Sequence, residues 1–503
     1  MGTAISAPVT TVVGLSGLSA TIYLYFIRKG PVFSAKYKFF GVNPPPKPKV
    51  VGFTAKGFES LEPLLTQAFG EGNDLGCQFA LYVKGELKVD IATGFTDRTF
   101  KVPYAQDTLQ LVFSSSKLVT SAIIAHLVNT GRMSFDDKIS KYWPEFAQGG
   151  KQDVTVAQFL AHRGGVAFLD PERVPTPEEL VDLDLLANKI AGQPHNFDGK
   201  EVSAYHAVSR GWFLNELVRR VTNGKTIRDI AYNEITPILN RNNTGVPYEI
   251  NFGIPDTPTN TQQATVSSRL ALLDGYSPIQ KMFFVIVPEF ILRWFGLLPV
   301  PRTLINAYLH KNTPQHMSLF KSGPDFTGRE AEFPWNYNDP TLLRSQSPSF
   351  CCLTNARSLA RLAELLRKSE FSETEGLLSP SVFRESFTEL GVQHDLVMAK
   401  PACFIQLGVG VVRDGFGVSG ERAGGELEWV GWAGAGGSIV YINRDYGVSI
   451  AYTNNFCHLQ SVGDERTWRL FEELVRIIKR DDPKGFEKVQ KANAFITIAG
   501  GEE

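Results

Sequence analysis

The chain has 503 residues, of which 43% are hydrophobic and 11% aromatic, so it can bury a large core and is not a disordered protein. Its 51 lysines and arginines nearly balance its 52 aspartates and glutamates, which excludes a whole-chain positive field that would attract nucleic acid. We therefore expect no nucleic-acid partner.

Metal and cofactor motifs are absent from the sequence. The five cysteines, at positions 77, 351, 352, 403 and 457, are odd in number and have no Cys-x-x-Cys spacing. Neither a zinc site nor a disulfide framework is indicated, which favours a reducing compartment. There is no His-Glu-x-x-His or Gly-x-Ser-x-Gly motif, and the stretch NGKT at 223–226 lacks the preceding glycine of a phosphate-binding loop. We expect no metal and no cofactor.

The first 27 residues carry no charged side chain and run apolar through APVTTVVGLSGLSATIYLYFI, close to the ~20 residues that cross a bilayer as a helix. Arg28, Lys29, Lys36 and Lys38 follow at once. Because a cleavable signal peptide carries its positive charges ahead of the apolar stretch, we predict an uncleaved single-pass membrane anchor over residues 1–30. The basic flank predicts that the main domain faces the cytosol, with mitochondrial and other organelle membranes left open. The alternative is a buried helix of the fold.

A proline-rich stretch, GVNPPPKPKVVG, predicts a stiff linker over residues 31–52. A large folded domain over residues 53–482 would follow, with a tail over 483–503. Its first part, 53–110, contains a helical pattern in KGFESLEPLLTQAF. The segments CQFALYV and LKVDIATGF then predict two strands around a Lys-Gly-Glu turn.

The middle and the end of the chain differ in the spacing of their apolar residues, which is helical in the middle and typical of strands near the end. Residues 111–399 are mainly helical in spacing, as in SKLVTSAIIAHLVNTG and GWFLNELVRRV, with an insertion at about 245–340. Within it, Lys281 to Pro301 is apolar but interrupted, and two interpretations stay open: a buried helix pair or a membrane-surface element. Strands return over 400–482, in CFIQLGVGVV, GAGGSIVYIN and YGVSIAYTNN, before a final amphipathic helix. This order predicts an α/β (α+β) fold in which distant segments complete one antiparallel sheet.

One candidate for chemistry is Ser114, which stands with Lys117 where LQLVF gives way to a helix that continues to about Asn129. Positions i and i+3 share a helix face, so the lysine amine would lie within reach of the serine hydroxyl. A lysine that burial keeps partly neutral can accept the hydroxyl proton. The spacing recurs at Ser318 and Lys321, where Pro324 prevents a long helix, and we interpret that copy as chance.

The stretch FSSSKLVTSAIIAHLVNTGRMSFDDKISKYWPEF, followed by DVTVAQFLAHRGGV, resembles the region around the active serine of the serine β-lactamase and penicillin-binding-protein superfamily, in its eukaryotic β-lactamase-like and carboxylesterase branch. The likeness extends from about residue 55 to 480. It implies a β-lactamase/transpeptidase-like fold, with a sheet flanked by terminal helices and a large helical insertion. It also implies that SAYHAVSRGWFLNELVRRV supplies Tyr205 as a proton shuttle facing the serine.

The same resemblance assigns the opposite wall of the site to GWAGAGGSIVYI, with Trp432, Ala433 and Gly434 at the Lys-Thr-Gly positions. Small residues there let a substrate approach the backbone. The backbone N–H groups of Ser114 and Ala435 would form the oxyanion hole, which stabilises the tetrahedral intermediate of acyl transfer.

The sequence departs from the lactamases and peptidases at two positions that bind polar substrate atoms. Ala207 stands where their asparagine would be, and Trp432 where their lysine would be. A substrate amide and carboxylate would then lose their partners, so an uncharged ester suits the site better than a penicillin. We interpret His162 as structural and His206 as a supporting or surface residue, with a catalytic role as the alternative for either.

The predicted function is a serine hydrolase that cleaves an ester or amide acyl bond of a small-molecule substrate through an acyl-enzyme on Ser114. Lys117 would be the base, Tyr205 the proton donor to the leaving group, and the Ala435 N–H part of the oxyanion hole. The alternative is a catalytically impaired β-lactamase-like protein that serves as a membrane-attached scaffold or assembly protein. Fluorophosphonate labelling distinguishes the two, because it requires an activated serine.

Overall fold

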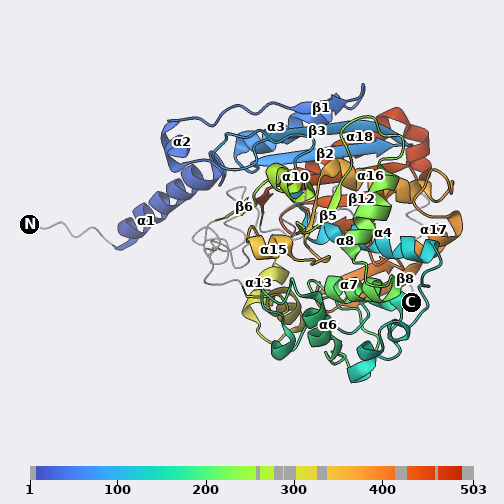
Figure 1. Ribbon diagram of the computed structural model, residues 1–503. Helices are drawn as coiled ribbons and strands as arrows, with labels where there is room; N and C mark the ends of the chain where they lie inside the picture. The colour runs from blue at the N-terminus through green and yellow to red at the C-terminus, as the bar shows by residue number, and fades with distance from the viewer. Residues whose placement is uncertain are drawn as a thin grey trace, which may run out of the picture.

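A nine-stranded antiparallel sheet lies at the centre of the computed structural model, which describes residues 7–255, 261–276, 287, 302–325, 337–413, 427–458 and 463–489 (Figure 1). The strand order is β1-β3-β2-β13-β12-β11-β10-β9-β8. The strands are β1 (Val51–Thr54), β2 (Gly76–Val83), β3 (Glu86–Gly94), β8 (Glu389–Asp395), β9 (Lys400–Ile405), β10 (Gly410–Val412), β11 (Trp429–Ala433), β12 (Ile439–Asn443) and β13 (Val448–Asn454).

The two ends of the sequence meet in the middle of this sheet. Strand β2 pairs with β13 in an antiparallel register that places Phe79 opposite Tyr452 and Leu81 opposite Ile450. Both strands are buried along nearly their whole length, since helices cover both faces of the sheet. The prediction of one antiparallel sheet completed by distant segments is confirmed.

Helices cover the sheet in two layers (Figure 1). On one face, α3 and α18 pack through residues such as Leu65 and Phe471 against Phe79 and Trp429 of the sheet. On the other face, α16 contacts β2, β12 and β13 and separates the sheet from the helical region. The helices named here are α3 (Glu62–Glu71), α16 (Ala356–Lys368) and α18 (Glu465–Asp481).

The helical region lies between β3 and β8 in the sequence. Its α-helices are α4 (Ser116–Asn129), α5 (Val156–Leu160), α6 (Leu183–Ala191), α7 (Arg210–Val221), α8 (Ile227–Ile230), α9 (Thr236–Leu239), α10 (Thr261–Arg269), α13 (Arg302–Leu309), α14 (Pro314–His316), α15 (Pro340–Arg344) and α17 (Pro380–Ser386). A small sheet of β4 (Gln110–Leu111), β7 (Cys352–Thr354) and β5 (Ile250–Phe252) crosses it, and β6 (Asp274–Gly275) pairs with β14 (Phe456–Cys457). The predicted element from Lys281 to Pro301 falls outside the described residues, apart from Val287.

Short helical turns complete the described chain. Five of them are 3-10 turns: η2 (Glu59–Leu61), η3 (Phe113–Ser115), η4 (Ile139–Lys141), η5 (Pro144–Gly150) and η6 (Pro171–Arg173). Three are π-helical: η1 (Tyr23–Ile27), η7 (Ala231–Ile235) and η8 (Met317–Lys321). Two of these turns, η3 and η8, lie at the site described below.

The N-terminal apolar segment does not form the predicted membrane anchor. Helix α1 (Ala7–Ile22) has 16 residues. The chain continues through the π-turn η1 and then bends, and no helix in the described ranges is long and apolar enough to cross a bilayer. The single-pass anchor over residues 1–30, and the membrane localisation and orientation drawn from it, were therefore wrong.

The chain after α1 packs against the folded body. Val32 and Phe33 are buried, and the Phe33 ring meets Phe69 of α3 edge-on at 5.6 Å. Helix α2 (Ala35–Phe40) follows, with its Lys38 amine buried 4.2 Å above the Tyr25 ring. Burial and the nearby Arg98 lower the pKa of Lys38 to about 8.

Candidate active site

A sharp backbone turn presents Ser114. The residue lies in η3, directly after β4, and the α-helix α4 begins only at Ser116, two residues later than the sequence pattern predicts. Phe113 adopts a φ of 47°, a left-handed conformation that a bulky residue rarely takes, and its buried ring packs edge-on against Tyr337 at 4.5 Å. Backbone strain of this kind persists only where the surroundings hold it in place.

The Lys117 side chain is fully buried beside Ser114. Its Nζ lies 3.1 Å from Ser114 Oγ, 2.8 Å from the carbonyl oxygen of Ala207 and 3.1 Å from that of Ser349. Burial, and secondarily the positive charge of Arg210, hold the pKa of Lys117 well below its usual value. Because desolvation disfavours the ammonium form, this lysine can serve as a proton acceptor.

Tyr205 approaches Ser114 from the loop before α7. Its hydroxyl donates to Ser114 Oγ at 2.8 Å and accepts a hydrogen bond from the indole Nε1 of Trp432 at 3.3 Å. The Lys117 amine lies 4.9 Å from the centre of the Tyr205 ring. Burial raises the pKa of Tyr205 to about 12, so its phenol keeps its proton near neutral pH.

Two further residues, Asp395 and His162, hold the loop that carries Tyr205. The sequence analysis missed Asp395 and did not assign this role to His162. The buried carboxylate of Asp395, at the end of β8, accepts from the Tyr205 N–H at 3.1 Å and from the Ser203 hydroxyl at 3.0 Å. The His162 Nδ1 accepts from the His206 N–H at 3.0 Å. Burial lowers the pKa of both His162 and His206, so both rings are neutral at pH 7. No sequence signal marks Asp395, since an aspartate in a partly exposed strand is an ordinary surface residue.

The opposite wall follows β11. A Cβ on Gly434 would collide with the Val112 carbonyl oxygen and the Ser438 hydroxyl, so only glycine fits there. Ser438 Oγ donates to the same Val112 oxygen at 2.7 Å and lies 3.1 Å from Ser115 Oγ, which joins this loop to the serine turn.

Two backbone N–H groups lie at the site, those of Ser114 and Ala435. Ala435 is exposed at the turn after Gly434, and within the described ranges neither its N–H nor that of Ser114 donates to another group of the chain. Free N–H groups near an acylated serine are what an oxyanion hole requires.

Trp432 lies in an aromatic cluster. Its ring centre is 5.6 Å from Phe404, 5.9 Å from His162 and 5.3 Å from Tyr205. The indole is half-buried, so one part of it is exposed and its N–H is engaged by the Tyr205 hydroxyl. The site therefore presents an apolar wall on this side.

The Beta-lactamase family model matches residues 64–473, which is most of the chain. The chain belongs to the β-lactamase family. All six residues predicted for the site, from Ser114 to Ala435, lie inside the match, as does the whole sheet apart from β1. The resemblance drawn from the sequence, and the α/β fold with its antiparallel sheet, are confirmed.

Individual β-lactamase-family relatives include esterases. Esterase/beta-lactamase LipL of Mycobacterium tuberculosis is 26% identical over 383 residues, covering 76% of this chain and 77% of LipL. The crystal structure of a penicillin-binding protein homolog from Caulobacter crescentus has a TM-score of 0.66 at 27% identity, covering 85% of this chain and 100% of that one. A family VIII carboxylesterase has the same TM-score of 0.66 at 21% identity and the same coverage, which is a likeness of fold alone.

Another feature of this β-lactamase-family site escaped sequence analysis. Arg210 begins α7, where a basic residue ordinarily faces solvent, yet its side chain is buried. Its guanidinium donates to the Leu160 carbonyl at 3.1 Å and to the Ser121 hydroxyl at 2.8 Å. Burial lowers its pKa to about 9, so it remains a cation at neutral pH and disfavours a second positive charge on Lys117.

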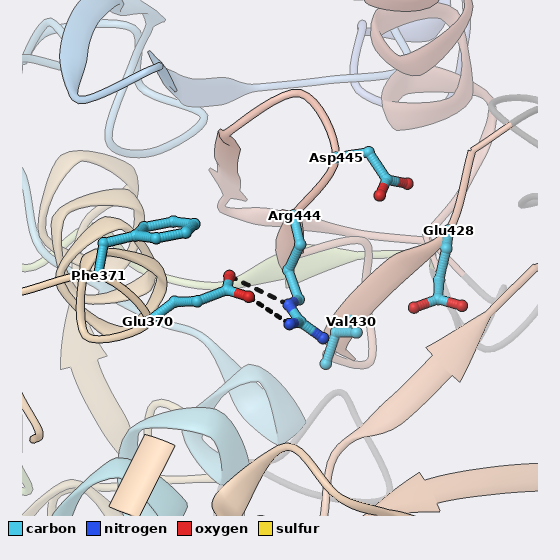
Figure 2. A pocket seen from close by; sticks show the side chains of 6 residues that line it. All are labelled: Glu370, Phe371, Glu428, Val430, Arg444 and Asp445. Atoms are coloured by element: carbon cyan, nitrogen blue, oxygen red, sulfur yellow. Dashed lines mark hydrogen bonds and ion pairs between the residues drawn. The ribbon is translucent and has the colours of Figure 1, made fainter. Parts of the chain in front are cut away.

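A separate pocket lies elsewhere, lined by Glu370, Phe371, Glu428, Val430, Arg444 and Asp445 (Figure 2). Arg444 forms a two-pronged ion pair with Glu370 across it. None of its lining residues belongs to the predicted site. Within the ranges described above, no group of three or more His, Cys, Asp or Glu side chains could hold a metal ion.

Proposed function

We propose that the chain is a serine hydrolase that cleaves an uncharged ester through an acyl-enzyme on Ser114. The observation that carries this proposal is the convergence of Lys117 and Tyr205 on one hydroxyl oxygen, at 3.1 and 2.8 Å. Membership of a hydrolase family with esterase relatives supports it. A nucleophile with a base and a second proton carrier in contact is the arrangement that covalent catalysis requires.

The hydrogen bonds around Lys117 suit a neutral amine. A neutral lysine has two N–H bonds and one lone pair, and the carbonyl oxygens of Ala207 and Ser349 take the two N–H bonds. In this neutral form the lone pair would face Ser114 and accept from its hydroxyl, whereas in the ammonium form the third N–H donates to Ser114 Oγ. The Tyr205 hydroxyl donates to Ser114 Oγ in turn, and the Trp432 indole donates to Tyr205. This chain of hydrogen bonds runs in one direction, from Trp432 towards the base.

Acylation follows from this order. Ser114 Oγ attacks the ester carbonyl carbon while its proton passes to Lys117, and the resulting oxyanion is stabilised by the N–H groups of Ser114 and Ala435. When the carbon–oxygen bond to the leaving group breaks, Tyr205 gives that alkoxide its proton and recovers one from the Lys117 ammonium. Water then attacks the acyl-enzyme by the same route in reverse, which frees the acid and restores the Ser114 hydroxyl.

The preference for an uncharged ester rests on Trp432 and Ala207. An indole offers no ion pair to a substrate carboxylate, and alanine offers no amide to a substrate peptide group. The aromatic cluster around Trp432 favours an apolar acyl or alcohol group instead.

The test uses a fluorophosphonate probe and a short-chain p-nitrophenyl ester on the full chain. We expect the probe to modify the peptide that contains Ser114, as mass spectrometry would locate, and the ester to be hydrolysed. Ser114→Ala should lose both labelling and at least about a thousandfold of turnover, because no other group can form the acyl-enzyme. Ser318→Ala, at the second copy of the spacing, should keep its labelling. Turnover or labelling in Ser114→Ala equal to that of the wild type would refute the proposal.

A further inference from the structure

We infer that Ser318 is a positioning residue for Tyr205, so the second Ser-x-x-Lys segment serves the first. This inference rests on the proposed function, since it assigns Ser318 a role in the same reaction. Ser318 does not contact the reacting atoms, and it acts through the backbone of the Tyr205 loop.

The Ser318 hydroxyl binds that backbone at two points. The residue lies in the π-helical turn η8 and is completely buried. Its Oγ donates to the carbonyl oxygen of Tyr205 at 2.9 Å and accepts from the N–H of Ala207 at 3.3 Å. One side chain from a distant segment therefore brackets His206 and fixes the peptide groups on both sides of it.

Ala207 links the Ser318 hydroxyl to the proposed base, Lys117, as well as to the proposed proton donor, Tyr205. Its N–H donates to Ser318, and its carbonyl oxygen accepts from Lys117 Nζ at 2.8 Å. A movement of the Ala207 backbone would therefore alter the direction of the Lys117 lone pair. Because Tyr205 lies two residues away in the same loop, the position of its hydroxyl would change as well. Both groups must stay within hydrogen-bond reach of Ser114 for the proposed proton transfers.

The rest of the segment is fixed to the helical region independently of this loop. Ser322 Oγ accepts from the Leu169 N–H at 3.1 Å and donates to the Met317 carbonyl at 2.8 Å. The Leu319 side chain packs against the main core. Thr313 caps the preceding turn by accepting from the His316 N–H at 3.2 Å. The segment that carries the Ser318 hydroxyl is thus held in place by its own contacts, as a positioning residue requires.

Ser322 provides the matched control. Both serines lie in the same segment, both are buried, and each makes one donated and one accepted hydrogen bond to backbone groups. They differ in which loop they bind: Ser322 binds residue 169, whereas Ser318 binds the loop that carries Tyr205. A general loss of packing in the segment would affect both alanine variants alike.

The experiment measures kcat and KM for a p-nitrophenyl ester, per active site titrated with fluorophosphonate, in wild type, Ser318→Ala, Ser318→Thr and Ser322→Ala. We expect Ser318→Ala to lower kcat about tenfold with KM little changed, because small displacements of catalytic groups cost rate more than binding. Ser318→Thr retains the hydroxyl and should recover most of the loss. Ser322→Ala should keep the wild-type kcat. Amide exchange in the peptide covering residues 203–209 should rise in Ser318→Ala and not in Ser322→Ala.

A double variant separates positioning from a merely structural role. In a Tyr205→Phe background, where the proton donor is already lost, Ser318→Ala should lower kcat by a smaller factor than it does in the wild type, because the part of its effect that acts through Tyr205 is gone and only the part that acts through Lys117 is left. Equal losses in Ser318→Ala and Ser322→Ala, or full additivity with Tyr205→Phe, would overturn the inference and leave the proposed function standing. A wild type without esterase turnover or labelling would overturn both. An active Ser318→Ala with normal kcat and raised amide exchange would overturn only the inference.

Discussion

The two Ser-x-x-Lys segments contain the same residue types at the same spacing in different surroundings. At the first, the lysine is completely buried, with its pKa lowered by burial and by the charge of Arg210, and the serine is half-buried. At the second, the serine is completely buried and Lys321 is exposed. The reactivity proposed for Ser114 therefore depends on which of the two side chains the fold keeps from water. A buried lysine is forced towards its neutral form, and an accessible serine can meet a substrate.

The largest expected effect tests the lysines of the two segments. Lys117→Ala should lower kcat/KM for a p-nitrophenyl ester by about a thousandfold, because it removes the base that takes the Ser114 proton. Lys321→Ala should change it by less than about twofold, since Lys321 is exposed to solvent, whereas the amine next to Ser114 is the buried Lys117. Steady-state kinetics on both variants, with circular dichroism to confirm folding, gives the measurement. Comparable losses in the two variants would remove the distinction between the segments.

An intermediate effect concerns Trp432, whose indole N–H donates to the Tyr205 hydroxyl. Trp432→Lys should raise the ratio of nitrocefin to neutral-ester kcat/KM, because an ammonium can pair with the carboxylate of the β-lactam. A new charge-assisted hydrogen bond contributes about 1.5–3 kcal/mol, which corresponds to roughly a tenfold to hundredfold change in the ratio. Ala207 limits the gain, since it supplies no amide to the substrate. Efficient nitrocefin hydrolysis by the unmodified chain would contradict the assigned role of Trp432.

The smallest expected effect is a displacement of the pH profile. Protonated Lys117 cannot accept a proton, so kcat/KM should fall as the pH drops through the pKa of Lys117. Arg210→Met removes the neighbouring cation that helps to lower that pKa, so the acid limb should move to higher pH.

The control for this measurement is Lys321→Met, which removes a charge from the exposed segment and should leave the acid limb in place. Tyr205, with a pKa of about 12, should add no basic limb below about pH 10. An acid limb that stays in place in Arg210→Met would show that burial alone sets the pKa of Lys117.

Different parts of the site were accessible to sequence analysis to different degrees. The Ser114–Lys117 pair was predicted from helical spacing together with the long apolar helix that follows it, since the same spacing at Ser318 and Lys321 is followed by Pro324. Tyr205 and Ala435 came only from the resemblance, since nothing local distinguishes a catalytic tyrosine from one in the core. The catalytic roles of these four residues remain predictions that the experiments above address.

The residues that support the site could not be predicted. Asp395, Arg210 and Ser318 act through contacts with residues from 50 to 192 positions away, and their local patterns describe ordinary surface or loop residues. The N-terminal segment failed for a related reason. An apolar, uncharged stretch does not by itself fix the length of the helix it forms, and no helix in the described ranges is long and apolar enough to cross a bilayer.

The pairing of β2 with β13 has a consequence for biosynthesis. The partners in this ladder are roughly 370 residues apart in the sequence. At ribosomal rates of about 5–20 residues per second, the β2–β3 hairpin emerges some 20–70 s before the strand that will cover its inner edge. During that interval the edge of β2 that will pair with β13 is exposed, and β2 is strongly apolar. Other chains can add to an unpaired strand edge of this kind. Early synthesis of this protein should therefore depend on chaperones that hold nascent strands apart until the C-terminal strands arrive.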